Sequence, residues 1–223
     1  MRSFLELLIY AFPFLMKGAL ITILITIFSV LLGFSLAVVM VYLRNNTNIY
    51  ISKLIGLYEW VFRGLPVLVL LLLIWLIPYI NINSFLTIII GLGLRSSAYQ
   101  SQIIRGALNS ISRVQTEAGL SLGLTKFKTF LFITFPQSIK LSLPGLSNEF
   151  TIILKDSPLA YVVAVAELLK RAENIISSNF RPFEIYLMCA VIYFVIYIIV
   201  ETIFKYINRS VYSESFVLQN KEK

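Results

Sequence analysis

The sequence GALITILITIFSVLLGFSLAVVMVYL occupies residues 18–43 and contains no charged side chain. Its 26 residues exceed the roughly 20 that a helix needs to cross the hydrocarbon core of a bilayer. The run is too long for the apolar part of a cleavable signal peptide, and no small-residue cleavage site follows it. It therefore predicts a transmembrane helix.

The composition of the whole chain agrees with a membrane protein. Of its 223 residues, 58% are hydrophobic and 13% are charged, and the mean hydropathy is +0.86. The chain has no His and a single Cys, Cys189, which excludes an intramolecular disulfide and a His/Cys metal cluster. We therefore expect no cofactor. The net charge of +8 comes from basic residues that flank apolar runs, so it indicates membrane orientation and no nucleic-acid partner.

Working outward from residues 18–43, we predict an all-α integral membrane protein with about five transmembrane helices. The other predicted spans are residues 64–78, 84–94, 141–169 and 185–200, and the last extends toward Tyr206. The second and third come from one charge-free run that is divided by a turn at residues 78–83. We expect an interfacial segment at residues 1–17, a transmembrane domain at 18–208 and a polar cytoplasmic tail at 209–223.

The distribution of Lys and Arg predicts the orientation in the membrane. With the N-terminus outside and the C-terminus in the cytoplasm, eleven of the 19 basic residues flank the cytoplasmic side and five flank the outer side. This asymmetry agrees with the rule that cytoplasmic loops are rich in Lys and Arg. It places the polar loop at about residues 106–138 in the cytoplasm.

That loop contains Glu117-Ala118-Gly119 and, four residues after the first glycine, a second one, Gly123. We expect a short helix over residues 115–124, which would place both glycines on one face, and a second amphipathic piece over 126–133. Because Gly weakens a helix by up to about 1 kcal/mol relative to Ala, two on one face indicate that a partner packs against bare backbone. The alternative is an interfacial helix whose glycines let it lie close to its own bundle.

The loop resembles the coupling motif of ATP-binding-cassette (ABC) importer permeases. Glu117-Ala118-Gly119, Gly123 and Ile133-Thr134-Phe135-Pro136 match that family's Glu-Ala-Ala, Gly and Ile-x-Leu-Pro at the same spacing. Further matches to its polar amino-acid branch are Arg63-Gly64-Leu65-Pro66, Ala98-Tyr99 with Arg105-Gly106, and Leu154-Lys155-Asp156-Ser157. One departure is Gln102, where the family has Glu. The ordered set covers roughly residues 10–210.

The resemblance implies a type I importer permease-like bundle in a bacterial inner membrane. Two permease subunits, of the same or a sister chain, would form the pathway. A coupling helix would dock on a cytoplasmic ATPase subunit, and an extracytoplasmic binding protein would deliver the amino acid. It implies an energy-coupling role for Glu117, Ala118, Gly119 and Gly123. The chain lacks the phosphate-cradling sequence Gly-x-x-x-x-Gly-Lys-Ser/Thr, so we expect ATP hydrolysis in a partner chain and no enzyme here.

The fourth predicted span holds the residues expected to line the substrate pathway. Charged groups inside a membrane are costly and normally face a cavity or one another. A zwitterionic amino acid offers a carboxylate for a cation and an ammonium group for a carboxylate. The candidates are Asn148, Glu149, Lys155, Asp156 and Ser157. The alternative is that these charges only stabilise the bundle or a subunit interface.

Two other classes of function are open on the sequence alone. A secondary transporter driven by an ion gradient could use the same charges to carry a small zwitterionic solute. It would not need a glycine-containing cytoplasmic loop, and five spans are few for one chain of that kind. A membrane-embedded enzyme is less well supported, because the chain has no His and no Ser or Cys beside a plausible base.

Overall fold

The computed structural model describes residues 4–77 and 83–221, and the residues that it describes form helices and short connections. In chain order the elements are α1 (Phe4–Asn46), α2 (Ile49–Gly64), α3 (Val67–Trp75), α4 (Ser84–Asn109), α5 (Arg113–Ser121), α6 (Lys126–Thr129), the π-helical η1 (Phe130–Thr134), α7 (Phe135–Asp156), the 3-10 helix η2 (Ser157–Val163), α8 (Leu168–Asn179) and α9 (Pro182–Lys221). The all-α class is as predicted.

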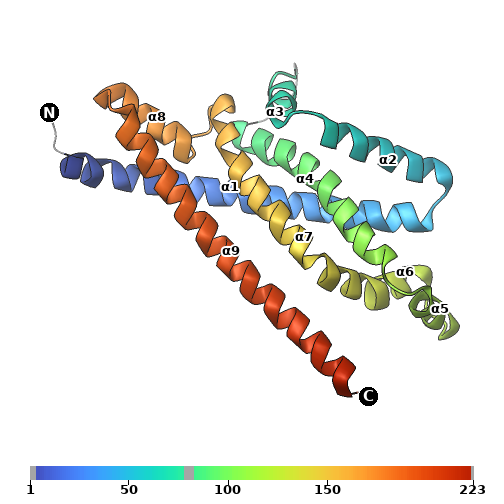
Figure 1. Cartoon of the computed structure of the whole chain (residues 1–223). Helices are drawn as coiled ribbons and strands as arrows, with labels where there is room; N and C mark the ends of the chain where they lie inside the picture. The colour runs from blue at the N-terminus through green and yellow to red at the C-terminus, as the bar shows by residue number, and fades with distance from the viewer. Residues whose placement is uncertain (1–3, 78–82, 222–223) are drawn as a thin grey trace.

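Helix α4 packs against α1, α7, α2 and α3 at the centre of the bundle (Figure 1). One apolar cluster joins Ile25 of α1, Leu71 of α3, Leu92 of α4 and Ile153 of α7, all four fully buried. Close approach of α1 and α4 depends on Gly33, because a Cβ there would lie 3.1 Å from the carbonyl oxygen of Gly93. Small residues at helix contacts are typical of packing within membranes.

Within residues 4–77 and 83–221, two helices are long and apolar enough to cross a membrane: α1 over Glu6–Asn46 and α9 over Pro182–Val211. Helices α2 and α3 form a third span if the pair, which bends by 104°, is counted as one. The predicted count of five is therefore not confirmed. The reason is physical: α4 and α7 bury Ser, Gln and Glu side chains, so their polarity is higher than that of a helix surrounded by lipid.

Several predicted boundaries differ from the structure. Residues 4–17, predicted as a separate interfacial segment, continue into the first span as one helix, and Leu7 and Leu15 are buried near α8 and α9. The predicted turn at residues 78–83 lies outside the described residues except for Asn83, whose side chain caps α4. The fourth predicted span, 141–169, is instead a helix that begins at Phe135 and ends at Asp156.

Helix α9 lies along one side of the bundle and its C-terminal half extends away from it (Figure 1). It continues to Lys221, well beyond Tyr206 and through most of the predicted polar tail. Phe194, Ile199 and Ile203 are more than half exposed in the isolated chain. Exposed apolar side chains along a long helix are what a bilayer or a second membrane subunit would cover.

Candidate functional site

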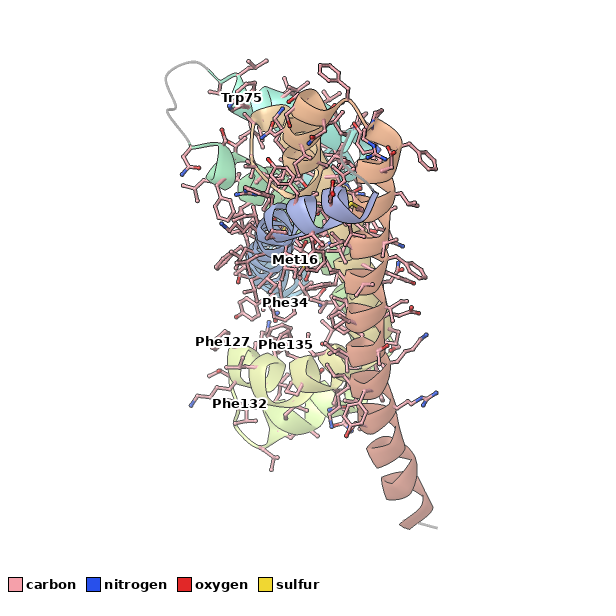
Figure 2. All side chains as sticks on the ribbon, turned by 90° about the vertical axis from the view of Figure 1, so that its left-hand side faces the viewer. Met16, Phe34, Trp75, Phe127, Phe132 and Phe135 are labelled. Carbon is pink, nitrogen blue, oxygen red and sulfur yellow. The ribbon has the colours of Figure 1, made fainter. Side chains whose placement is uncertain are left out.

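The predicted coupling loop forms a hairpin of α5, α6 and η1 at one end of the bundle, far from α8 (Figure 1). Figure 2 shows Phe127 and Phe132 at this end. Thr125 caps α6, since its hydroxyl accepts the Lys128 amide at 3.3 Å. The predicted pair of short helical pieces is present, and the first piece spans Arg113–Ser121, not 115–124.

The two glycines of the hairpin do not share a helix face, which corrects the prediction. Gly123 lies beyond the end of α5 with φ of +79°, a conformation that strongly favours Gly. The Leu124 amide donates to the Gly119 carbonyl at 3.1 Å, and the Gly123 amide donates to Leu120 at 3.0 Å. This is the Schellman pattern, so Gly123 terminates the helix.

Gly119 faces the interior of the hairpin. It is the buried residue of α5, and a Cβ there would lie 2.7 Å from Thr129 Cγ2 and 2.8 Å from Ile133 Cδ1. The absence of a side chain therefore lets α5 pack on α6 and η1 of the same chain. Gly119 therefore makes contacts within its own chain, and no partner is needed to explain a glycine at this position.

The surface that the hairpin presents outward is the opposite face of α5. Glu117 and Ala118 are exposed there, between the apolar side chains of Val114, which is 66% exposed, and Leu122, which is 81% exposed. Spacings of three, four and eight residues place this set on one side of a helix. Exposed apolar side chains rimmed by polar ones are typical of a surface that binds another protein.

The structure separates the five pathway candidates into two groups. Asp156 pairs with Arg95 of α4, with Nη1 and Oδ2 3.0 Å apart. The buried Glu149 interacts with Ser96 of α4, and its Oε1 has no hydrogen-bond partner among the described residues. Glu149 and Asp156 thus meet α4, at a group of partly buried charges between two helices.

The other candidates lie elsewhere. The Lys155 ammonium lies 4.6 Å from the centre of the Tyr197 ring on α9, whereas Asp156 pairs with Arg95. Asn148 of α7 is exposed and lines a pocket together with Glu201 of α9. Ser157 directly follows the last residue of α7, is buried, and donates its hydroxyl to the Leu154 carbonyl at 2.7 Å.

One buried polar network was missed by the sequence reasoning. Glu59 of α2 is 2% exposed, pairs with Arg44 at the end of α1, and accepts the Ser101 hydroxyl at 2.9 Å and the Gln102 amide at 3.3 Å. The available signal was a single carboxylate between Tyr58 and Trp60 in an otherwise apolar stretch. The polar stripe of α4 supplies its partners.

Aromatic and cationic side chains extend this network along α4. The centre of the Tyr99 ring lies near two guanidinium groups, 5.1 Å from that of Arg63 and 4.9 Å from that of Arg95. Arg63 also donates to Gln102. The Arg95–Asp156 pair and the Glu59 network are therefore linked by contacts along one side of α4.

Comparisons with known proteins agree with this arrangement. Residues 29–212 match the family described as "Binding-protein-dependent transport system inner membrane component". The chain is 36% identical to the probable amino-acid permease protein YxeN of Bacillus subtilis (strain 168), over 87% of this chain and 89% of YxeN. It is 30% identical to the glutamine transport system permease protein GlnP of Escherichia coli (strain K12), over 89% of this chain and 93% of GlnP.

A solved structure shares the fold over nearly the whole chain. The crystal structure of an amino acid ABC transporter with histidines superposes with a TM-score of 0.83 at 32% identity, covering 94% of this chain and 99% of that one. The predicted resemblance is confirmed, and the comparisons do not support the gradient-driven alternative. This chain belongs to the family of inner membrane components of binding-protein-dependent transport systems.

Proposed function

We propose that this chain is the membrane-spanning permease subunit of an ATP-driven importer for polar amino acids. Similarity to GlnP, a glutamine transport permease, and to an amino acid ABC transporter structure supports this substrate class. The chain contains no phosphate-cradling sequence, so a separate ATPase subunit supplies the energy. The other partners in the proposal are a second permease subunit and an extracytoplasmic binding protein.

The observation that carries the coupling proposal is the exposed face of α5. An ATPase subunit covers the strip formed by Val114, Glu117, Ala118 and Leu122, which is open in the isolated chain. Gly119 and Gly123 take part by shaping the hairpin: the first keeps α5 close to η1 and the second ends the helix. ATP-driven movement of the docked hairpin then biases a bundle with two arrangements.

The transport pathway follows α7 in this proposal. Arg95 and Asp156, with the buried Glu149, offer both signs of charge to a zwitterion on the α4 side. Lys155 and Asn148 offer a cation and an amide on the α9 side, and Ser157 offers a hydroxyl directly after the end of α7. Opposite charges held at low exposure suit recognition of an ammonium and a carboxylate group.

The topology in the proposal is N-terminus outside and C-terminus cytoplasmic, in a bacterial inner membrane. The α5–α6 hairpin is then cytoplasmic, where an ATPase subunit can reach it. The loop before α9, with the exposed Phe183 just inside the helix, is on the outer side. A residue of the hairpin and Phe183 therefore lie on opposite sides of the membrane in this proposal. Together they can test both the orientation of the chain and the docking of the ATPase subunit.

The chain suits a cysteine cross-linking test, because its single cysteine, Cys189, is buried. In a Cys189→Ser background we would introduce Leu122→Cys or Phe183→Cys and cross-link in native membranes. We expect Leu122→Cys to cross-link to a cytoplasmic ATP-binding subunit and Phe183→Cys not to do so. Labelling of Leu122→Cys from the outside of intact cells, or no ATPase adduct at Leu122→Cys, would contradict the proposal.

A further inference from the structure

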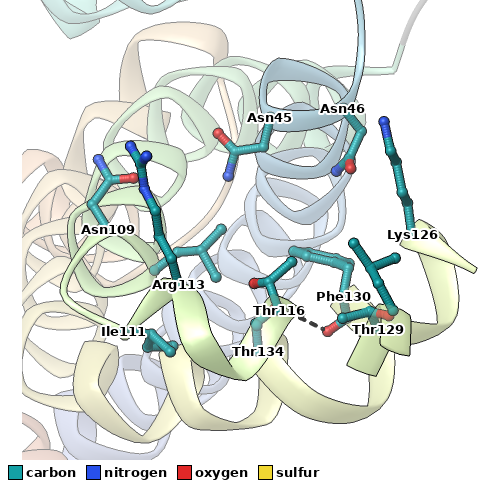
Figure 3. A pocket seen from close by; sticks show the side chains of 12 residues that line it. Asn45, Asn46, Asn109, Ile111, Arg113, Thr116, Lys126, Thr129, Phe130 and Thr134 are labelled. Atoms are coloured by element: carbon teal, nitrogen blue, oxygen red, sulfur yellow. Dashed lines mark hydrogen bonds between the residues drawn. The ribbon is translucent and has the colours of Figure 1, made fainter. Parts of the chain in front are cut away.

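A polar pocket of about 670 Å³ lies behind the coupling hairpin, between it and the ends of two bundle helices. Asn45 and Asn46 come from the end of α1, Asn109 from the end of α4, Arg113 from α5, and Lys126 and Thr129 from α6. Figure 3 shows Arg113 and Lys126 on opposite sides, with Asn45 and Asn46 between them. An occupant of this pocket would touch the hairpin and the bundle at once.

The lining of the pocket is positively charged. It contains two cations, amides and hydroxyls, and no carboxylate. Among the described residues, neither Arg113 nor Lys126 has an ion-pair partner. Amide and hydroxyl groups can donate hydrogen bonds alongside the cations. The pocket therefore favours an anion with several acceptor oxygens and disfavours a cation.

A second, independent feature lies in the wall of the same pocket. Thr129 is 1% exposed and lines the pocket, and its Oγ1 has no hydrogen-bond partner among the described residues. A buried hydroxyl normally has a partner, because leaving it unpaired costs free energy. A bound acceptor oxygen would supply that partner.

The start of α5 is also electrostatically incomplete. Ser112 precedes the helix without capping it by its side chain, and the first turn contains no acidic residue. The first residue is Arg113, which adds a positive charge to the positive end of the helix dipole. An anion in the pocket would compensate both the missing cap and the positive charge at the start of α5.

We propose that this pocket binds a phosphate-bearing anion. The volume exceeds that of inorganic phosphate and is in the range of small-ligand sites, so it has room for a phosphate ester. Two sources share this chemistry: the headgroup of an acidic phospholipid, or a soluble phosphate ester. Binding is a property of this chain alone and does not depend on the coupling function proposed above.

The test uses the full chain in phosphatidylcholine nanodiscs. Binding of inorganic phosphate, glycerol 3-phosphate or added phosphatidylglycerol is followed by native mass spectrometry and by thermal unfolding. We expect the wild-type chain to bind at least one probe and Arg113→Gln/Lys126→Gln to bind it at least about ten-fold more weakly. The control Lys53→Gln/Lys128→Gln removes the same charge from outside the pocket, and we expect a change below about two-fold.

The probes distinguish the sources. Binding of phosphatidylglycerol without binding of the soluble probes identifies a lipid site, and binding of glycerol 3-phosphate or phosphate identifies a soluble ligand. Either result supports the proposal. Binding of no probe by the wild-type chain, or an equal loss in the control variant, would overturn it.

A second variant keeps the test decisive if the double variant does not fold. Thr129→Val has nearly the same shape and removes the unpaired hydroxyl. We expect the empty protein to unfold at a higher temperature, since a buried unsatisfied group is lost, and the ligand to bind at least about three-fold more weakly. An unchanged affinity in Thr129→Val would then stand against the site.

Discussion

The interior of the bundle around α4 buries charged side chains, whereas the α5–α6 hairpin exposes apolar ones. In the bundle, the carboxylate side chains of Glu59 and Glu149 are buried between helices. On the hairpin, Val114 and Leu122 are exposed beside charged and polar side chains. In the isolated subunit, each region therefore contains side chains in an unfavourable environment. These are buried carboxylates in the bundle and exposed apolar groups on the hairpin.

The two regions differ in where these side chains find their partners. The carboxylate of Glu59 finds its partners within the same chain, in Arg44, Ser101 and Gln102. Leu122 has no such cover in the isolated chain, and in our proposal the ATPase subunit provides it. The Glu59 network thus belongs to the stability of the chain itself, whereas we propose that the outer face of the hairpin acts only in an assembly.

Breaking the buried network should have the largest effect on the isolated chain. We expect Glu59→Ala to lower the free energy of unfolding by about 3 kcal/mol, because Arg44 would keep a poorly solvated charge without a partner. The measurement is the thermal unfolding midpoint of the purified chain in detergent. A double change to apolar residues, Arg44→Met/Glu59→Leu, should recover most of the loss.

The matched control for this prediction is an ion pair at the surface. Lys170 and Glu173 lie 3.1 Å apart with side chains about one-third exposed. Glu173→Ala should cost less than about 1 kcal/mol, because water and salt screen an exposed pair. If Glu59→Ala costs no more than Glu173→Ala, the network does not stabilise the bundle in this way.

Changing the outer face of the hairpin should leave the chain folded and weaken its assembly. We expect Leu122→Asp to reduce recovery of the ATPase subunit with the affinity-purified permease at least about ten-fold, equivalent to about 1.4 kcal/mol. The unfolding midpoint should change little, since surface substitutions are usually within about 0.5 kcal/mol. Phe183→Asp, at a similarly exposed apolar residue at the other end of the molecule, is the control. Equal recovery from both variants would remove the basis for docking at α5.

The sequence predicted the class of this fold better than its helix boundaries. Charge-free runs identify α1 and α9, because a helix facing lipid must be apolar all round. They do not identify α4 and α7 in full, since those helices exchange polar contacts inside the bundle, as Arg95 does with Asp156. The bend between α2 and α3 was also missed, although Gly64 and Pro66 mark its place.

At the candidate site, spacing predicted a helix but assigned the wrong face to its glycines. A four-residue interval places Gly119 and Gly123 together only if the helix continues through both. Whether it continues depends on Gly123 adopting a positive φ, and Gly is compatible with either outcome. The contact of Gly119 with Thr129 and Ile133 depends on how the chain returns through η1, which no local pattern contains.

The smallest predicted effect separates the two possible roles of Gly123. If Gly123 ends α5, Asn should be tolerated there better than Ala, because Asn adopts the left-handed conformation more readily, whereas Ala pays about 1–2 kcal/mol. If Gly123 instead lies in the docking contact, the larger Asn should be the more damaging of the two. Hydrogen exchange of the Leu124 amide, which bonds to the Gly119 carbonyl, reports the state of the helix end.

We therefore expect faster exchange in Gly123→Ala than in Gly123→Asn, with ATPase recovery following the same order and with both losses smaller than for Leu122→Asp. Gly106→Ala controls for replacing a glycine as such, because a Cβ at Gly106 meets no atom within 4 Å and the residue lies inside α4. It should stabilise the chain by up to about 1 kcal/mol. The reverse order, with Asn worse than Ala in recovery but not in exchange, would place Gly123 in the docking contact after all, and the docking surface would then extend past Leu122 around the end of α5.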